Sequence, residues 1–482
     1  MSHSFDPSRT FPRSGLRPQI DQLFRRWCAA SLIFLAVAAC APTVPERSAP
    51  VDLPAQFSDS GTVMLPGRWW QSFNDPVLDD LMTQTLAGNL SLKSAWDRLD
   101  QARAIARTAG AQAYPTLNAE GQVARNWLLG DDQSSSSYGF GLVAGYEVDL
   151  WGRIRSQREA ALLDAVASEE DLKAAALTVA AQLATTWYQL VEQYSQAEIL
   201  NRQIVTNSQS LELISLRFRT GQSAIADVLQ QRQLIETNRG ELARIQSRTQ
   251  VLEHQLAVLA GQPPDRSVVP TTGAFVNLSP LPETGVPAEL VRRRPDIRAA
   301  WARLAAADYR QAAAVADRFP RLSLSGQVGA EAGRVGDLFD NWLTSLAGHL
   351  VGPLLDGGLR RAEIDRNRAL VAEELHGYGQ TVLGALGEVE DALVQERLQR
   401  QYIAHLDRQQ GLAEQAVERI RDRYLNGAED YQRVLSALLS LQGLQRNRLT
   451  ARRELYEYRI QLCRALAGVW ELEPPGSEMS DR

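Results

Sequence analysis

The order of hydrophobic and polar residues predicts a helix, two strands and two further helices in the first half of the chain. Residues 92–113 have apolar positions at helical spacing, and Tyr114-Pro115 ends that helix. From 116 to about 150, apolar and polar residues alternate around a polar turn at 130–137, which predicts a strand hairpin. A long helix at 152–219 and a return helix at 223–260 follow, and Gly221 separates them.

The second half of the chain repeats this plan. Residues 92–123 align with 297–328 at a shift of 205, and the identities include Trp96 with Trp301 and Pro115 with Pro320. The repeat predicts strands at about 321–356, a long helix at 359–426 and a return helix at 430–467, with Gly427 between the last two. We therefore predict two structural repeats, 76–261 and 291–468, joined by an equatorial linker at 262–290.

The predicted elements make the fold mainly helical with a small β portion. In each repeat the two shorter helices together match the length of the long one. Stacked end to end beside the long helix, they would form a second column, so that the long helix leads away from the strands and the shorter helices return. Four strands per chain cannot close a barrel in a membrane, because an open edge leaves backbone groups without partners. Three copies would supply 12 strands, a usual even number for such a barrel.

The N-terminal residues have the pattern of a secretory signal. Arg25 and Arg26 precede a short apolar run at 29–39, and Cys40 follows Val-Ala-Ala, which resembles the site where bacterial lipoproteins are cut and acylated. We predict a signal peptide at 1–39, lipidation of Cys40, and a lipid-anchored tether and equatorial segment at 40–75. Ordinary cleavage near Ala39, with Cys40 incidental, is the alternative. Residues 469–482 are expected to form a C-terminal tail.

Composition and motifs exclude several function classes. A net charge of −6 is unlike that of a general nucleic-acid binder, and 44% hydrophobic residues with a mean hydropathy of −0.25 exclude a bundle of membrane-spanning helices. The five histidines are scattered, and the three cysteines match no metal-binding spacing. A glycine pattern at 139–144 formally fits a dinucleotide fingerprint but lies inside a predicted strand. We predict no enzymatic activity, no catalytic residues, no metal and no cofactor.

Several segments in this order resemble the TolC-type outer-membrane efflux proteins, also called outer membrane factors, and particularly their NodT-like lipoprotein branch. The resemblance extends from Cys40 to about Gly468, and it is carried by residues 69–76, 147–153, 293–300, 319–324 and 355–358. It implies a homotrimer in which long helical hairpins form an α-barrel and four strands per chain form a shared 12-stranded transmembrane β-barrel. It also implies docking with a periplasmic adaptor and an inner-membrane pump.

The resemblance assigns roles to the helical turns. In this family these turns form the periplasmic tip that contacts the adaptor and closes the pore, and here they contain Arg217, Phe218, Gly221, Arg423, Tyr424 and Gly427. The glycines also suit left-handed helix caps, and both roles stay open. Family members often have acidic gate residues where this chain has Arg433 and Ser436. An interaction between Asp227 and Arg433 would lock the closed tip; two solvated charges are the alternative.

The predicted function is that of a passive export channel. We expect a bacterial outer-membrane channel with a long periplasmic extension, anchored in outer-membrane lipid, that conducts small toxic compounds or drugs delivered by a proton-driven pump. The first alternative is the exit channel of a type I protein secretion system. A non-channel, coiled-coil envelope lipoprotein is the second, and the alternating strands argue against it.

Overall fold

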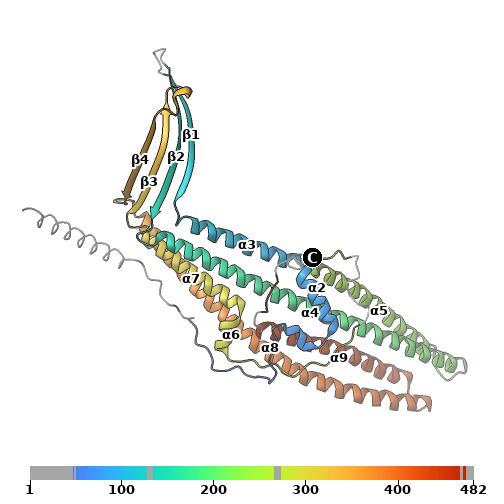
Figure 1. Cartoon of the computed structure of the whole chain (residues 1–482). Coiled ribbons are helices and arrows are strands. Elements are labelled where there is room, and N and C mark those ends of the chain that lie inside the picture. Colours follow the sequence, from blue (N-terminus) through green and yellow to red (C-terminus); the bar gives the residue numbers. More distant parts are fainter. Residues whose placement is uncertain (1–46, 48–49, 128–133, 265–272, 467–469, 474–482) are drawn as a thin grey trace, which may run out of the picture. The chain divides into compact units, whose positions relative to one another are not determined.

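The computed structural model describes residues 47, 50–127, 134–264, 273–466 and 470–473 of the chain. This part is mainly helical, with one small sheet (Figure 1). The elements are η1 (Trp69–Phe73), α2 (Pro76–Gly88), α3 (Leu90–Ala111), β1 (Thr116–Trp127), β2 (Ser134–Val148), α4 (Arg153–Arg219), α5 (Ile225–Leu259), α6 (Pro287–Arg293), α7 (Pro295–Ala316), β3 (Arg321–Ala332), η2 (Val335–Asp337), β4 (Trp342–Val351), α8 (Leu359–Leu425) and α9 (Tyr431–Leu466).

The chain divides into two compact units, and each unit takes segments from both halves of the sequence. The strand unit consists of Met1–Arg47, Ile105–Leu162 and Ala305–Val371, and it contains the whole sheet. The helical unit consists of Ser48–Ala104, Leu163–Leu304 and Ala372–Arg482, and it contains most of the long helices.

The sheet of the strand unit is antiparallel throughout, in the order β1-β2-β3-β4. Its register keeps side chains of one kind on one face, because residues that pair directly across strands point to the same side. Leu142 of β2 pairs with Ala119 on β1 and with Val328 on β3, and Val328 pairs with Thr344 on β4. The other face contains the alternate residues, among them Glu120, which pairs with Gly141. The predicted alternation of apolar and polar faces is therefore present in the paired sheet.

The long helices of the helical unit form two hairpins, α4 with α5 and α8 with α9 (Figure 1). Both α4 and α8 have 67 residues, about 100 Å at the rise of an α-helix. In the described part of the chain, no helix combines the length and the apolar character that a bilayer span requires.

Side-chain hydrogen bonds define which long helices are neighbours. Tyr194 of α4 donates to Glu253 of α5 at 3.0 Å, and Gln203 of α4 donates to Gln445 of α9 at 2.9 Å. Gln399 of α8 donates to the Ala451 carbonyl of α9 at 2.8 Å. The contacts thus place α4 beside both α5 and α9, and α9 beside α8. Helix α5 also contacts α9 directly, and α5 and α8, the helices at the two sides, share no hydrogen bond in the described chain.

The main core of the helical unit surrounds the N-terminal short helices. Trp69 and Phe73 of η1 are almost fully buried against Tyr188 of α4 and Tyr456 of α9. Asp75 is buried here and accepts the backbone N–H groups of Val77 and Leu78, so it caps α2. Its second carboxylate oxygen accepts the Trp187 indole N–H at 2.8 Å and the Tyr188 hydroxyl at 3.3 Å. One carboxylate therefore joins the start of α2 to the core.

A buried ion pair in the helical unit holds residues 279 and 280 of the equatorial linker in place. Arg459 of α9 and Glu396 of α8 form a salt bridge, and both side chains are almost completely buried. The Arg459 guanidinium also donates to the carbonyls of Ser279 and Pro280, at 2.9 and 3.1 Å. Because the charges are paired and hydrogen-bonded, the linker backbone is held against the two helices.

The buried Cys463 thiol provides a test of this core. Burial raises the pKa of Cys463 to about 12, although the nearby charge of Arg459 acts in the opposite direction. At pH 8 only about one thiol in ten thousand would be ionised at such a pKa, against roughly a quarter in an unfolded chain. We expect iodoacetamide to alkylate Cys463 at least about a thousandfold more slowly in the folded protein than in guanidinium, as measured by peptide mass spectrometry. Comparable rates would contradict this packing.

Candidate functional site

One face of the sheet exposes apolar side chains over all of its strands. Leu117 of β1 is 69% exposed, Leu346 of β4 is 86% exposed and Leu350 of β4 is 67% exposed. Other exposed apolar residues on this face are Val123, Phe140, Leu142, Leu324, Val328 and Trp342. An apolar surface of this extent is not expected to face water.

The opposite face is mostly polar, with exposed Leu343 and Val351 of β4 as exceptions, and it contains a hollow of about 160 Å³. Gly139 and Gly141 of β2 and Gly329 of β3 lie in it, and Glu120 and Glu331 lie beside it. Gly141 allows a close approach of the strands, since a Cβ there would lie 3.0 Å from the Val328 carbonyl oxygen. The two faces together suit a sheet with lipid on one side and water on the other.

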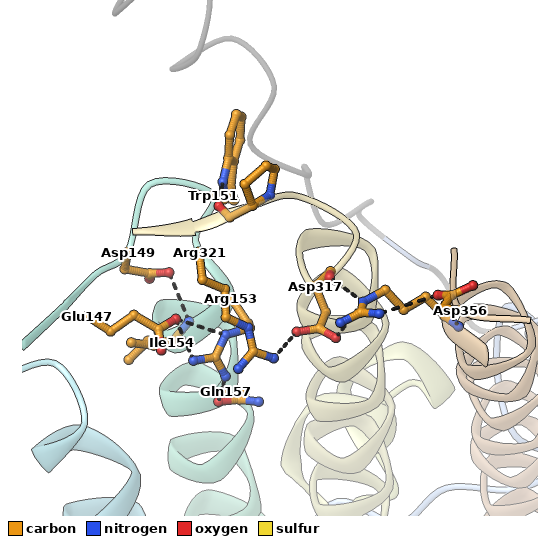
Figure 2. A network of polar contacts seen from close by, with 11 residues as sticks. Glu147, Asp149, Trp151, Arg153, Ile154, Gln157, Asp317, Arg321 and Asp356 are labelled. Atoms are coloured by element: carbon orange, nitrogen blue, oxygen red, sulfur yellow. Dashed lines mark hydrogen bonds and ion pairs between the residues drawn. The ribbon is translucent and has the colours of Figure 1, made fainter. Parts of the chain in front are cut away.

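Where the sheet meets the long helices, an aspartate caps each helix start (Figure 2). Asp149, just after β2, accepts the backbone N–H groups of Ile154 and Arg155 at 3.1 and 2.7 Å. Asp356, after β4, accepts those of Gly358 and Arg360 at 3.0 and 3.3 Å. These bonds satisfy free N–H groups in the first turns of α4 and α8. The backbone bonds to Gly358 and Arg360 also lower the pKa of Asp356.

Arginines link the same helix starts to the neighbouring strands (Figure 2). Arg153 of α4 forms a 2.7 Å salt bridge with Glu147 at the end of β2. Arg360 of α8 donates to the Asp317 backbone carbonyl at 2.8 Å, and Arg321 at the start of β3 pairs with the Asp317 carboxylate. The Trp151 indole donates to the Pro320 carbonyl at 2.8 Å, and its ring stacks on Phe319. Each strand-to-helix connection is therefore braced by side chains of the strand unit.

The two hairpin turns of the helical unit end their long helices in the same way. Gly221 donates to the Phe218 carbonyl and Gln222 to the Arg217 carbonyl, while Gly427 donates to Tyr424 and Ala428 to Arg423. Both glycines have positive φ, +76° and +73°. This bonding pattern is the Schellman cap, which favours glycine because a Cβ is strained in that conformation. The capping role of these glycines is thus seen directly, and contact with a partner protein stays a prediction.

The predicted tip residues form a small cluster at these turns. The Arg217 guanidinium lies 4.7 Å from the centre of the Tyr424 ring and donates to the Leu425 carbonyl at 3.2 Å. Tyr424 also packs against Tyr431, and both are buried with Val228 and Val434. Phe218 stays 40% exposed, and Arg423 forms a 3.2 Å salt bridge with Glu429. All four long helices meet in this cluster.

The structure does not bring Asp227 and Arg433 together. Asp227 lies in the first turn of α5 and accepts the Ser223 hydroxyl at 2.7 Å and the Ala224 backbone N–H at 3.2 Å. Arg433 forms a 3.4 Å salt bridge with Glu429, and Ser436 donates to the Gln432 carbonyl of its own helix. Within one chain, then, each proposed gate residue has a local partner.

Sequence reasoning missed a row of buried amide side chains between α4, α5 and α9. The side-chain oxygen of Asn207 accepts the amide N–H of Gln442 at 3.2 Å, and its backbone carbonyl accepts that of Gln231 at 2.7 Å. The Asn238 amide donates to the side-chain oxygen of Gln442 at 3.4 Å. Tyr431 donates its hydroxyl to Gln231. We call these residues the polar seam. In the sequence alone, their polar side chains indicate solvent-exposed helix positions, because the neighbouring residues do not show which helix packs against them. The candidate lipidation residue, Cys40, lies outside the described residues.

The comparisons with known proteins decide the family. The model of the family "Outer membrane efflux protein" matches residues 81–262 and 286–468, which is most of the chain. The chain belongs to this family. It is 32% identical over 469 residues to the pyoverdine export outer membrane protein OpmQ of Pseudomonas putida, covering 94% of this chain and 99% of that protein.

Two further comparisons agree with this family. Nodulation protein T of Rhizobium leguminosarum bv. viciae is 27% identical over 455 residues, covering 91% of this chain and 93% of the relative. Among solved structures, the outer-membrane channel OprN superposes with a TM-score of 0.83 at 29% identity, covering 89% of this chain and 99% of that one. The predicted resemblance to outer-membrane efflux proteins, including the NodT-like branch, is confirmed, and so is a mainly helical fold with a small sheet. Family members are channels.

Replacing Gly427 by alanine tests the cap at the tip. A Cβ there meets no atom within 4 Å but has to adopt φ of +73°, so we expect local stability to fall by about 1 kcal/mol. Gly411→Ala is the control, since Gly411 lies inside α8 with open space around it, and alanine there is expected to stabilise the helix by about 1 kcal/mol. Hydrogen exchange of peptides over 405–435 should speed up for G427A and slow down for G411A. Equal effects would contradict the cap.

Proposed function

We propose that three copies of this chain close a 12-stranded β-barrel in the outer membrane and form a channel. The observation that carries the proposal is the sheet itself, which has one exposed apolar face, one polar face and two outer strands, β1 and β4. In lipid the free backbone groups of β1 and β4 would be very unfavourable unless paired. Pairing β4 of one copy with β1 of the next satisfies both edges and directs the polar face toward a water-filled lumen.

The long helices support the same ring closure. On α8, the outer helix at one side, Val394, Leu398 and Leu412 are exposed on the face opposite its buried residues. On α5, the outer helix at the other side, Leu229, Val251 and Val258 are likewise exposed opposite its buried face. We define these as the α8 stripe and the α5 stripe. Apolar stripes on both outer helices suit head-to-tail packing of α8 on α5 of the next copy, which closes a ring.

The channel we propose is the outer-membrane component of a tripartite efflux system. It conducts small toxic compounds passively, while a proton-driven inner-membrane pump and a periplasmic adaptor deliver them, and the chain itself performs no catalysis. Support comes from the family, whose relatives include a protein named for pyoverdine export, and from the tip cluster, where four helices converge on two capped turns. These turns, with exposed Phe218 and Arg423, are the proposed adaptor contact.

We also propose that Cys40 is acylated and anchors the chain in the outer membrane. Support comes from its position after Val-Ala-Ala and from Arg47, which lies seven residues further on. Arg47 forms a bidentate ion pair with Asp308 of α7, at 2.8 and 2.9 Å, and the Asp308 side chain is buried. This pair fastens the beginning of the chain to the strand unit, as expected for a short tether.

Disrupting the α8 stripe tests the assembly. We expect Leu398→Asp to prevent trimer formation, because it places a charge in an apolar seam, and to abolish ion conductance in planar bilayers. Ala404→Asp is the matched control, since Ala404 is exposed on α8 outside the stripe and should leave both properties unchanged. Light scattering in detergent measures the mass of the assembly, and single-channel recording measures the ion conductance. A monomeric wild-type protein without conductance would rule out the channel and favour a non-channel tether.

Metabolic labelling with palmitate tests the anchor. Cys40→Ser removes the only thiol next to the proposed cleavage site, so the mature chain should lose all label. Cys463→Ala, which changes a thiol in the helical core, should keep the label. Undiminished labelling of the Cys40 variant would show that acylation, if present, is elsewhere.

A further inference from the structure

A polar cavity of about 610 Å³ lies in the helical unit between α4, α5 and α9. Its volume is in the range of sites for small molecules. Ile245 is the one apolar residue of its lining, and the rest is charged or hydrogen-bonding. Asn238, a member of the polar seam, belongs to the lining, whose other residues come from α4, α5 and α9.

The lining carries more positive than negative charge. Its acidic residues are Glu192 and Glu241, and each is already paired with an arginine of the same lining. Glu192 binds Arg453 at 2.8 Å, and Glu241 binds Arg244 at 2.6 Å. Burial alone would lower the pKa of Arg453, but Glu457 and Glu192 outweigh it and raise that pKa, so this arginine stays charged and bound.

Two arginines of the lining remain available. Arg248 of α5 is exposed and has no acidic partner among the described residues. Arg446 of α9 donates one N–H to the side-chain Oε1 of Gln203 at 3.2 Å and forms no ion pair with a carboxylate in the described chain. Guanidinium groups bind carboxylates with two parallel hydrogen bonds, which fixes both charge and orientation.

A buried glutamine adds a second requirement. Gln196 of α4 is 6% exposed and lines the cavity, and its Nε2 donates to the Arg446 backbone carbonyl at 3.0 Å. Its Oε1 is buried and has no hydrogen-bond partner in the described chain. A buried carbonyl oxygen without a donor is unfavourable, so a ligand hydroxyl or amide N–H that reaches it, when the side chains covering it move, would be bound.

We infer that this cavity is a binding site for a small organic anion that carries carboxylates together with a hydroxyl or amide donor. Arg248 and Arg446 bind the carboxylates, and Gln196 Oε1 accepts the donor hydrogen. Thr237 and Asn447 supply further hydrogen bonds at the rim. The inference rests on the proposed function in one respect, because it takes the ligand to be exported cargo.

Calorimetry with citrate as the probe tests the site in the purified full-length protein at constant ionic strength. Citrate carries carboxylates and a hydroxyl, so we expect saturable binding. In Arg248→Gln/Arg446→Gln the affinity should fall at least tenfold. Arg202→Gln/Arg239→Gln makes the same change of charge at exposed, ion-paired arginines outside the cavity and should bind as the wild type does.

Tricarballylate, which is citrate without the hydroxyl, tests the role of Gln196. Loss of one hydrogen bond should weaken binding about fivefold. If citrate does not bind, or if both double variants lose the same amount of citrate affinity, the proposed site is wrong. If citrate and tricarballylate bind with equal affinity, the proposed role of Gln196 is wrong. Conductance of the same preparation in a bilayer is measured separately, so a channel that conducts but binds no citrate refutes this inference alone.

Discussion

The outer edges of a four-stranded antiparallel sheet impose the main physical constraint on this protein. Strands β1 and β4 pair on one side each, and their other sides present backbone donors and acceptors to the surroundings. In water such an edge is tolerable, but in hydrocarbon each unpaired group would cost several kcal/mol. The apolar face of the sheet makes water an unsuitable surrounding for that side. Our proposal that copies of the same chain assemble rests on these two facts together, and the exposed apolar residues of α5 and α8 fit the same proposal.

The helical unit is built to be stable in two different ways along its length. Around Trp69, Tyr188 and Tyr456 the helices pack through a large apolar core, and Asp75 joins α2 to it by bonds to Trp187 and Tyr188. Farther along the hairpins, side chains of the polar seam replace apolar packing. The apolar core gains stability from the area that it buries. The hydrogen-bonded amides add little net stability, but they define which residues face each other.

Much of the fold could be predicted from the sequence because its signals are local. Alternation at 116–150 specifies which face each strand residue occupies, and the pairing of Leu142 with Val328 keeps that assignment across the sheet. Glycine at 221 and 427 marks the ends of α4 and α8, since only glycine adopts that cap without strain. The second strand of the second repeat ends earlier than expected, at Val351, just before Gly352-Pro353, because proline cannot continue a ladder.

Long-range partners could not be predicted, because sequence patterns do not show which helix faces which. Asp227 illustrates the point, since a charge four residues after Ser223 reads equally as a cap or as a partner for a distant arginine, and local bonds engage it in the structure. In the polar seam, replacing Asn207 alone by an apolar residue would leave the Gln442 amide group buried without its acceptor. Replacing Gln442 as well would leave the Asn238 amide without its own acceptor, so the three residues depend on one another. Homologous chains should therefore change these three positions together, and coupled substitution, rather than invariance, is the evolutionary signature of such a contact.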